Sequence, residues 1–301
     1  MIYGDIAQTI NKHIYPALIG WQLNVFLIGS AQDVPNSLRD YLRKKLLEVW
    51  YYPKLEIFYP EELFDELFQG RNEIDLLHLE NLLALSVHAI VIVLESAGSI
   101  AELGAFANHE ALKNRLVVVV DQKYKKKKSF IMLGPVKMLR KKTDSNVIYC
   151  DFENISEDSL NKLREKVNGS IRKIAKQVTP DNSIKNLIYA QFFLLAAVYV
   201  MQPITKANII QMIRSISKEA EDTVMAIVNS SLNILLRNKE LLLRSGQYEL
   251  SKEGLRRIQG ILKYKQRLTN VMLDKLRVTV LNHTMRKTKK RGAQILSLAE
   301  A

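Results

Sequence analysis

The segment Glu95–Phe106, ESAGSIAELGAF, places a carboxylate close to serines and glycines. It follows an apolar β-branched run and continues into a helical pattern. Gly98 and Ser99 favour a tight turn there, and the Ser99 hydroxyl is expected to cap the helix. Glu102 would then lie in the first helical turn, where the helix N-terminus keeps a carboxylate ionised and available as a nucleophile. The spacing Ser99-x-x-Glu102 also fits a capping box, and the pattern alone favours that structural role.

The elements that would position this segment are short apolar strands alternating with amphipathic helices. Strands are expected at 22–30, 55–59, 89–94 and 116–121, and helices at 37–49, 76–85 and 99–112. Continuous β-branched runs alternating with helices predict an α/β fold, a doubly wound parallel sheet with ligands at the carboxyl ends of its strands. Gly29 and Ser30 end the first strand, where they would let the backbone approach a ribose or a phosphate.

After Cys150 the sequence pattern changes from apolar strand-like runs to a polar helical segment. We expect an α/β domain over residues 1–150, a polar helical linker over 151–182 and a second domain over 183–301. A cluster of helix breakers and caps at 179–183 marks the boundary. The second domain is almost entirely helical apart from LLLRSGQYEL at 241–250, which predicts a hairpin. Helices followed by a hairpin and another helix are the order of a winged helix.

A net charge of +13 favours phosphate-rich partners, because neutralised phosphates release counterions. The long helix expected at 218–241 begins with Glu219, Glu221 and Asp222, a poor face for the DNA major groove. Basic residues follow, and they predict backbone binding without sequence readout: Arg237, Lys239, Arg244, Lys252, Arg256, Arg257, Lys263, Lys265 and Arg267. The alternative is a protein-binding winged helix with a solvated basic surface. Lys125–Lys128 would grip phosphates or form a solvated loop.

Several classes of protein are disfavoured. A single cysteine excludes a disulfide framework and fits a reducing compartment. The first ten residues lack the pattern of a signal peptide, and the apolar run 187–201 is too short for a membrane span, so it predicts a buried helix. His78, His88 and His109 have no metal-site spacing, and no Walker motif is present. We therefore expect a soluble cytoplasmic protein that binds no metal and does not act at a membrane.

The motif GSxxELGAF after a buried strand resembles the nucleoside 2-deoxyribosyltransferase-like superfamily, whose fold is Rossmann-like. More closely, the chain resembles the deoxyribosyltransferase-like effectors (toxins) encoded beside bacterial retrons, in stretches at 57–68, 76–84, 95–108, 128–141 and 186–194. The resemblance implies that Glu102 is the nucleophile. It places Glu80 near the sugar or base, where the alternative is an exposed helix carboxylate. The substrate site would include Gly29, Ser30, Glu80, Glu95, Ser96, Gly98 and Ser99.

A carboxylate that attacks C1′ of a ribose passes through an oxocarbenium-like transition state and forms a covalent glycosyl-enzyme. Several transferases of the superfamily carry an aspartate just before the Gly-Ser pair, which helps to protonate the departing base, whereas Ser96 and Ala97 stand there in this chain. Nicotinamide leaves NAD neutral and needs no proton, which favours NAD hydrolysis, with NAD as substrate and no bound cofactor. The alternatives are a deoxyribosyltransferase, an N-glycosidase acting on nucleotides or DNA, and a non-catalytic nucleotide-sensing adaptor.

The resemblance also implies partners. A retron reverse transcriptase and its multicopy single-stranded DNA (msDNA) would hold the effector inactive until phage infection. A neighbouring subunit often completes the site in the superfamily, so a homo-oligomer is compatible with it.

Overall fold

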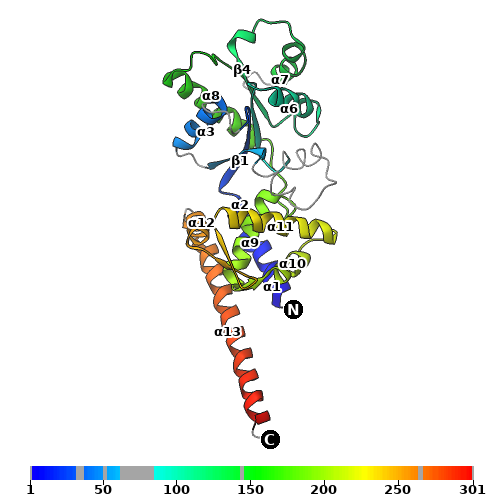
Figure 1. The fold of residues 1–301 in the computed structure, drawn as a ribbon, viewed down its shortest axis with the longest axis vertical. Coiled ribbons are helices and arrows are strands. Elements are labelled where there is room, and N and C mark those ends of the chain that lie inside the picture. Colours follow the sequence, from blue (N-terminus) through cyan, green and yellow to red (C-terminus); the bar gives the residue numbers. More distant parts are fainter. Residues whose placement is uncertain are drawn as a thin grey trace. The chain divides into compact units, whose positions relative to one another are not determined.

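A computed structural model of the chain describes residues 2–31, 37–49, 53–61, 85–142, 146–263 and 267–299, with backbone alone at 2, 142, 263, 267, 268 and 287–299. The chain divides into two compact units (Figure 1). One is Trp21–Asp181, called here the α/β unit. The other, the helical unit, joins Met1–Gly20 to Asn182–Ala301.

A parallel sheet of five strands forms the α/β unit, in the order β2-β1-β3-β4-β5. Its strands are β1 (Gln22–Ile28), β2 (Lys54–Phe58), β3 (Ala89–Val93), β4 (Leu116–Asp121) and β5 (Val147–Cys150). Every residue of β1, β3 and β4 is buried, as in a sheet covered on both faces. The expected α/β class with a parallel sheet is confirmed.

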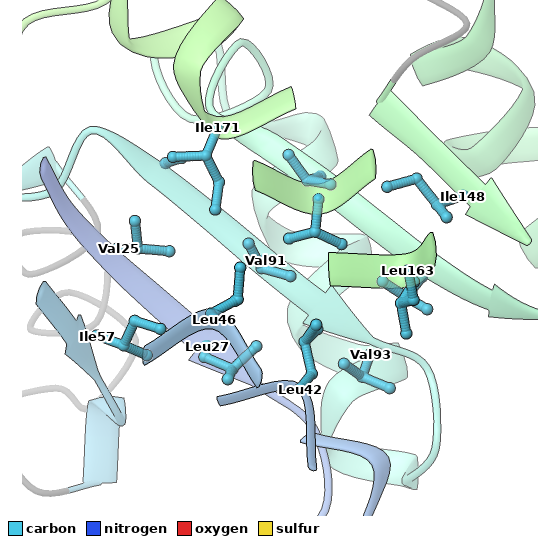
Figure 2. Packing of buried hydrophobic residues seen from close by; sticks show 14 of the residues in the cluster. Val25, Leu27, Leu42, Leu46, Ile57, Val91, Val93, Ile148, Leu163 and Ile171 are labelled. Atoms are coloured by element: carbon cyan, nitrogen blue, oxygen red, sulfur yellow. The ribbon is translucent and has the colours of Figure 1, made fainter. Parts of the chain in front are cut away.

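Helices cover both faces of this sheet (Figure 1). The helices that pack on the strands are α3 (Leu38–Glu48), α6 (Ala97–Asn108) and α8 (Glu157–Ala175). The unit also contains the short η2 (Gln122–Tyr124) and η3 (Met132–Val136), and α7 (Lys137–Lys142). Figure 2 shows the core under α3 and α8, where Leu42 and Leu46 meet strand side chains such as Leu27. Each fully buried aliphatic side chain of this kind contributes about 1.5–3 kcal/mol relative to exposure.

The expected linker at 151–182 is not a separate element. α8 packs on β3, β4 and β5 and on α3. Leu163, Val167 and Ile171 recur at helical spacing on its buried face, which joins the core of the sheet. The α/β unit therefore extends to Asp181 instead of ending at 150.

The N-terminal residues belong to the helical unit, although the sequence suggested that the α/β domain begins at residue 1. α1 (Ile2–Thr9), η1 (Ile10–Ile14) and α2 (Tyr15–Ile19) contact helices from the C-terminal part. The Tyr15 ring packs edge-on against Phe193 with centroids 6.2 Å apart, and its hydroxyl donates to the Ser183 carbonyl at 3.2 Å. A short apolar helix face does not reveal which core it will join.

The remaining elements of the helical unit follow in sequence: α9 (Leu187–Met201), β6 (Ile204–Thr205), α10 (Lys206–Arg214), α11 (Glu221–Arg237), β7 (Leu241–Arg244), β8 (Gln247–Leu250), α12 (Lys252–Lys263) and α13 (Arg267–Ala299). α9 is buried along almost its whole length, which confirms the expected core helix. β7 and β8 form the expected hairpin, and β6 pairs with β8 in an antiparallel sheet. Ser245 and Gly246 both have positive φ angles, as a two-residue hairpin turn requires. In the part of the chain that is described, no helix is long and apolar enough to cross a membrane.

Candidate active site

The carboxyl ends of β1 and β3 lie side by side, because Ile28 pairs with Ile92 in the parallel ladder. This is the point where the strand order reverses, with β2 on one side of β1 and β3 on the other. Ligands of open α/β sheets bind at such a point. The loops that follow the two strands carry Gly29–Ser30 and Glu95–Ser99, so the structure brings these predicted site residues together.

Glu95 joins the two loops through its carboxylate. Its Oε1 accepts backbone N–H bonds from Ser30 at 3.0 Å and Arg39 at 3.2 Å, and its Oε2 accepts one from Leu38 at 3.0 Å. The last two amides belong to the first turn of α3, so Glu95 satisfies donors that the helix itself leaves open. In this structure the carboxylate is engaged by the protein's own backbone, a structural role that the sequence did not suggest.

Gly29 is required by the same contact. A Cβ atom at this position would lie 2.6 Å from the Glu95 Oε1 and 2.9 Å from the Arg39 Cβ. Any side chain would push the carboxylate away from the amides that it binds. The glycine thus serves a close internal approach, in addition to any approach by a ligand.

The start of α6 differs from the expectation. The N-cap is Ser96, whose Oγ accepts from the Ser99 N–H at 3.1 Å and donates to the Gly29 carbonyl at 2.7 Å. The Ser99 Oγ in turn accepts from the Ser96 N–H at 3.2 Å, which completes a capping box between the two serines. The expected box between Ser99 and Glu102 is therefore wrong. Ser96 prevails because its hydroxyl also ties the helix to the β1 loop.

Glu102 lies in the second turn of α6, as the sixth helical residue, and it is half-buried. The predicted first-turn position is wrong, and with it the predicted support from the helix N-terminus, which fades beyond the first turn. Leu103 and Phe106 bury the face of α6 that meets the sheet, and Glu102 stands at the edge of that face. The capping box of α6 therefore does not involve Glu102.

A buried cation lies beside these loops, and sequence reasoning missed it. Arg39 is fully buried; its Nη1 pairs with the Glu61 Oε1 at 2.8 Å, and its Cζ lies 4.2 Å from the centre of the Tyr59 ring. Its Nε and Nη2 have no hydrogen-bond partner among the described residues. Tyr59 donates to the Asp40 Oδ1 at 2.6 Å, and burial together with this bond raises the pKa of the phenol. In the sequence, the only indication of this buried cation was an arginine in the first turn of the helix expected after the Gly-Ser loop.

The other residues singled out in the sequence lie in different surroundings. Gly98 is exposed in the first turn of α6. Glu80 lies outside the described residues.

His88 is buried and accepts the Asn24 N–H at 3.0 Å through Nδ1. Burial and the nearby Arg115 lower the pKa of His88 to about 4, so it packs as a neutral side chain. Among the described residues, no group of three or more His, Cys, Asp or Glu side chains could hold a metal ion.

The basic residues of the helical unit divide into exposed and internal ones. Arg237, Lys239, Arg244 and Arg256 are exposed. Arg257 is not: it pairs with Glu240 at 2.6 Å, with side chains 18% and 13% exposed, and its Cζ lies 4.6 Å from the centre of the Phe192 ring. Arg257 thus holds α12 against α9 and is a poor candidate for gripping phosphates. The side chains of Lys263, Lys265 and Arg267 lie outside the described residues.

Comparison with known proteins places the chain in a family. The family described as STM3845 retron effector protein matches residues 35–242. A protein of Escherichia coli named "Retron Ec86 putative ribosyltransferase/DNA-binding protein" is 33% identical over 276 residues, which cover 88% of this chain and 86% of the relative. A second, "Retron Ec73 putative ribosyltransferase/DNA-binding protein", also from Escherichia coli, is 35% identical over 98 residues, 32% of this chain and 31% of the relative. The chain therefore belongs to the STM3845 family of retron effector proteins.

Proposed function

We propose that the α/β unit cleaves N-glycosidic bonds with Glu102 as the nucleophile, and that NAD is its substrate. The observation that carries this proposal is the division of roles after β3. Ser96 and Ser99 cap α6, and Glu95 binds backbone amides, so Glu102 is the carboxylate of this segment that neither task explains. The names of the two relatives point to the same class of chemistry.

In the proposed first step, a Glu102 oxygen forms a bond to C1′ of the ribose while the bond from C1′ to the base nitrogen breaks. The base takes the bonding electron pair, and the sugar is held as an ester of Glu102. Water then attacks the same carbon, the ester bond breaks, and the proton of the water leaves to solvent. Ser30 and Gly98, together with Glu80, would contact the substrate, whereas Ser99 is fully buried and serves the cap of α6.

The environment of Glu95 supports NAD as the substrate. An ordinary nucleoside base needs a proton in order to leave, and the carboxylate nearest to the usual position of the acid is Glu95. Both oxygens of that carboxylate accept backbone N–H bonds, three in all, so Glu95 is engaged in holding the loops and is poorly placed to hand a proton to a departing base. Nicotinamide carries a positive charge in NAD and leaves as a neutral molecule, so it does not need this proton.

The helical unit supports a role in docking. Its order of α9, β6, α10, α11, β7 and β8, with the three strands in one antiparallel sheet, is that of a winged helix. We infer a winged-helix domain that binds nucleic acid through exposed basic residues such as Arg237, Lys239, Arg244 and Arg256. Glu221 and Asp222 open α11, which favours contact with phosphates from the hairpin side over major-groove reading.

We further infer that the partners are the retron reverse transcriptase and its msDNA, which would hold the effector inactive in the cytoplasm. A neighbouring copy of the chain could complete the site. Two other functions compete with NAD hydrolysis: deoxyribosyl transfer or base release from nucleosides, nucleotides or DNA, and nucleotide sensing without catalysis.

Product analysis separates these functions. The purified protein is incubated with NAD, deoxynucleosides, nucleotides and single-stranded DNA, and the products are separated by chromatography. NAD hydrolysis predicts nicotinamide and ADP-ribose in equal amounts, lost in the Glu102→Gln variant. New deoxynucleosides formed when a second base is added would show transfer, and binding of NAD without products would show a sensor.

A further inference from the structure

A groove of about 520 Å³ runs along β5, the strand at one edge of the sheet and far along the sheet order from β1. Its walls come from three elements: the segment after β4, β5 itself and one face of α8. The lining residues are Gln122, Lys125, Val147, Ile148, Tyr149, Glu165, Lys166, Gly169, Ser170 and Lys173. None of these residues belongs to the proposed active site.

Positive charge dominates the groove. Lys125 reaches it from the segment after β4, while Lys166 and Lys173 stand two turns apart on α8, and all three are exposed. Glu165 is the acidic residue in the lining. Lys126–Lys128 continue the positive charge along the chain from Lys125. A groove lined in this way favours a chain of phosphates.

Two features of the walls lack an internal explanation. The Tyr149 hydroxyl is buried and has no hydrogen-bond partner among the described residues. Gly169 lies inside α8, where glycine is less favourable than alanine by about 0.8–1.0 kcal/mol. Apart from the adjacent backbone of α8 itself, no atom of the described residues lies within 4 Å of the Cβ that a side chain would add. The glycine keeps the helix backbone open to the groove.

Aromatic rings accompany the lysines in the segment after β4. Phe130 is 86% exposed and Tyr124 is 40% exposed. The Lys127 Nζ lies 5.0 Å from the centre of the Tyr124 ring, and the Lys125 Nζ lies 5.2 Å from that of Tyr149. Phe130 is five residues from Lys125, a span of about 18 Å at most.

We propose that this groove and the segment Tyr124–Phe130 bind single-stranded nucleic acid. Lys125, Lys166 and Lys173 contact the phosphates, and unpaired bases stack on Phe130. A basic groove beside exposed aromatic rings is the arrangement that binds single strands, because their bases present free faces that a duplex keeps stacked. This surface lies on the α/β unit, so it adds to the docking surface proposed for the helical unit and does not depend on the chemistry of Glu102.

Charge reversal tests the groove. The full chain is titrated with a fluorescein-labelled 15-nucleotide oligo(dT) at several salt concentrations, and binding is followed by anisotropy. Lys166→Glu with Lys173→Glu should weaken binding at least tenfold and lower the log–log salt slope by about 0.7 for each lost phosphate contact. The matched control is Lys44→Glu with Lys137→Glu, two exposed lysines of the same unit outside the groove, which should bind within about twofold of the unaltered chain.

Shape and stacking are tested without a change of charge. Gly169→Phe should block the groove, whereas Gly169→Ala should bind normally and confirm that the helix tolerates a side chain. Phe130→Ala should weaken binding about fivefold or more, and Phe130→Tyr should restore it, because stacking needs an aromatic face.

Crosslinking separates this surface from the helical unit. Oligo(dT) that carries 5-bromodeoxyuridine should crosslink to peptides from 122–149. Crosslinks confined to residues 182–301, or equal losses in the groove and control variants, would overturn the proposal. Equal competition by a DNA duplex or by polyglutamate would also overturn it, and would indicate a general polyanion or an acidic protein as the partner.

Discussion

Replacing Glu95 by glutamine should destabilise the α/β unit, although the two side chains have nearly the same shape. The carboxylate accepts N–H bonds from Ser30 and Arg39 on one oxygen and from Leu38 on the other. A glutamine has one acceptor atom and one donor group. Whichever way the amide turns, its NH₂ group faces at least one backbone N–H, and that pair cannot bond.

The size of the effect follows from these contacts. A hydrogen bond to a charged group contributes about 1.5–3 kcal/mol, compared with about 0.5–1.5 kcal/mol for a neutral one. Glutamine would turn two charged bonds into neutral ones and lose the third. Because the site is only partly buried, we expect a loss of about 2–4 kcal/mol in the free energy of unfolding, a large part of the roughly 5–15 kcal/mol of a typical protein.

Urea unfolding followed by circular dichroism measures this loss. The matched control is Glu56→Gln on β2, whose carboxylate is about one-third exposed and lies 3.6 Å from the Lys54 ammonium. A weak surface pair of this kind should change the stability by less than about 1 kcal/mol. If Glu95→Gln unfolds at the same urea concentration as the control, the three backbone contacts do not hold the loops, and the structural role assigned to Glu95 is refuted.

Four further predictions concern other parts of the chain. Glu102→Gln should lower the rate of turnover by several powers of ten, abolish toxicity and leave the fold intact, because an amide cannot attack C1′. Turnover near the unaltered rate would exclude the proposed nucleophile. In cells that express the protein without its partners, NAD should fall as nicotinamide and ADP-ribose appear, whereas unchanged NAD with free adenine or cytosine would indicate cleavage of nucleosides or nucleic acid. Arg257→Ala should destabilise the helical unit by about 3 kcal/mol, because it removes a largely buried partner of Glu240 and the contact with Phe192. Arg256→Ala should only lower the salt slope of DNA binding by about 0.7–0.9, and similar behaviour of the two variants would contradict this division. Burial lowers the pKa of His88 to about 4 in the folded chain, against an ordinary 6.5, so the unfolded chain takes up the proton first. The free energy of unfolding should therefore fall by roughly 3 kcal/mol as the pH drops from 6.5 to about 4. An equal loss in the His88→Asn variant would show that other groups cause it.

Four of the five strands and the meeting of the β1 and β3 loops could be predicted from the sequence, whereas β5 (Val147–Cys150) was missed. Runs such as Leu116–Asp121 are continuous and β-branched, and the helices between the runs have the spacing of parallel crossovers. The carboxyl ends of parallel strands share one edge, so Gly29 and Glu95 were expected close together, and the structure places them in contact. The hairpin at 241–250 could be predicted because Ser245–Gly246 permits the required turn.

Features that depend on distant contacts could not be predicted. Two serines three residues apart could each cap α6, and the choice depends on the Gly29 carbonyl, which belongs to the loop after β1. The burial of Arg39 depends on Tyr59 and Glu61, and sequence spacing does not show that these residues meet. Arg257 looked like its exposed neighbour Arg256 until α9 supplied Phe192 as its contact.

In the mechanism that we propose, the two carboxylates that follow β3 have separate roles, one structural and one chemical. Glu95 stands two residues beyond the strand, and its two oxygens accept three backbone N–H bonds, so attack on a substrate carbon would compete with the contacts that hold the loops. Glu102 stands seven residues later, on a helix whose cap is already satisfied by two serines. A nucleophile needs both an accessible lone pair and a fixed position. Glu95 holds the β1 loop and α3 together beside the proposed site, and α6 places Glu102 at the edge of its buried face. Changes at Glu95 should therefore reduce the stability of the site first and its activity as a consequence, whereas changes at Glu102 should reduce activity alone.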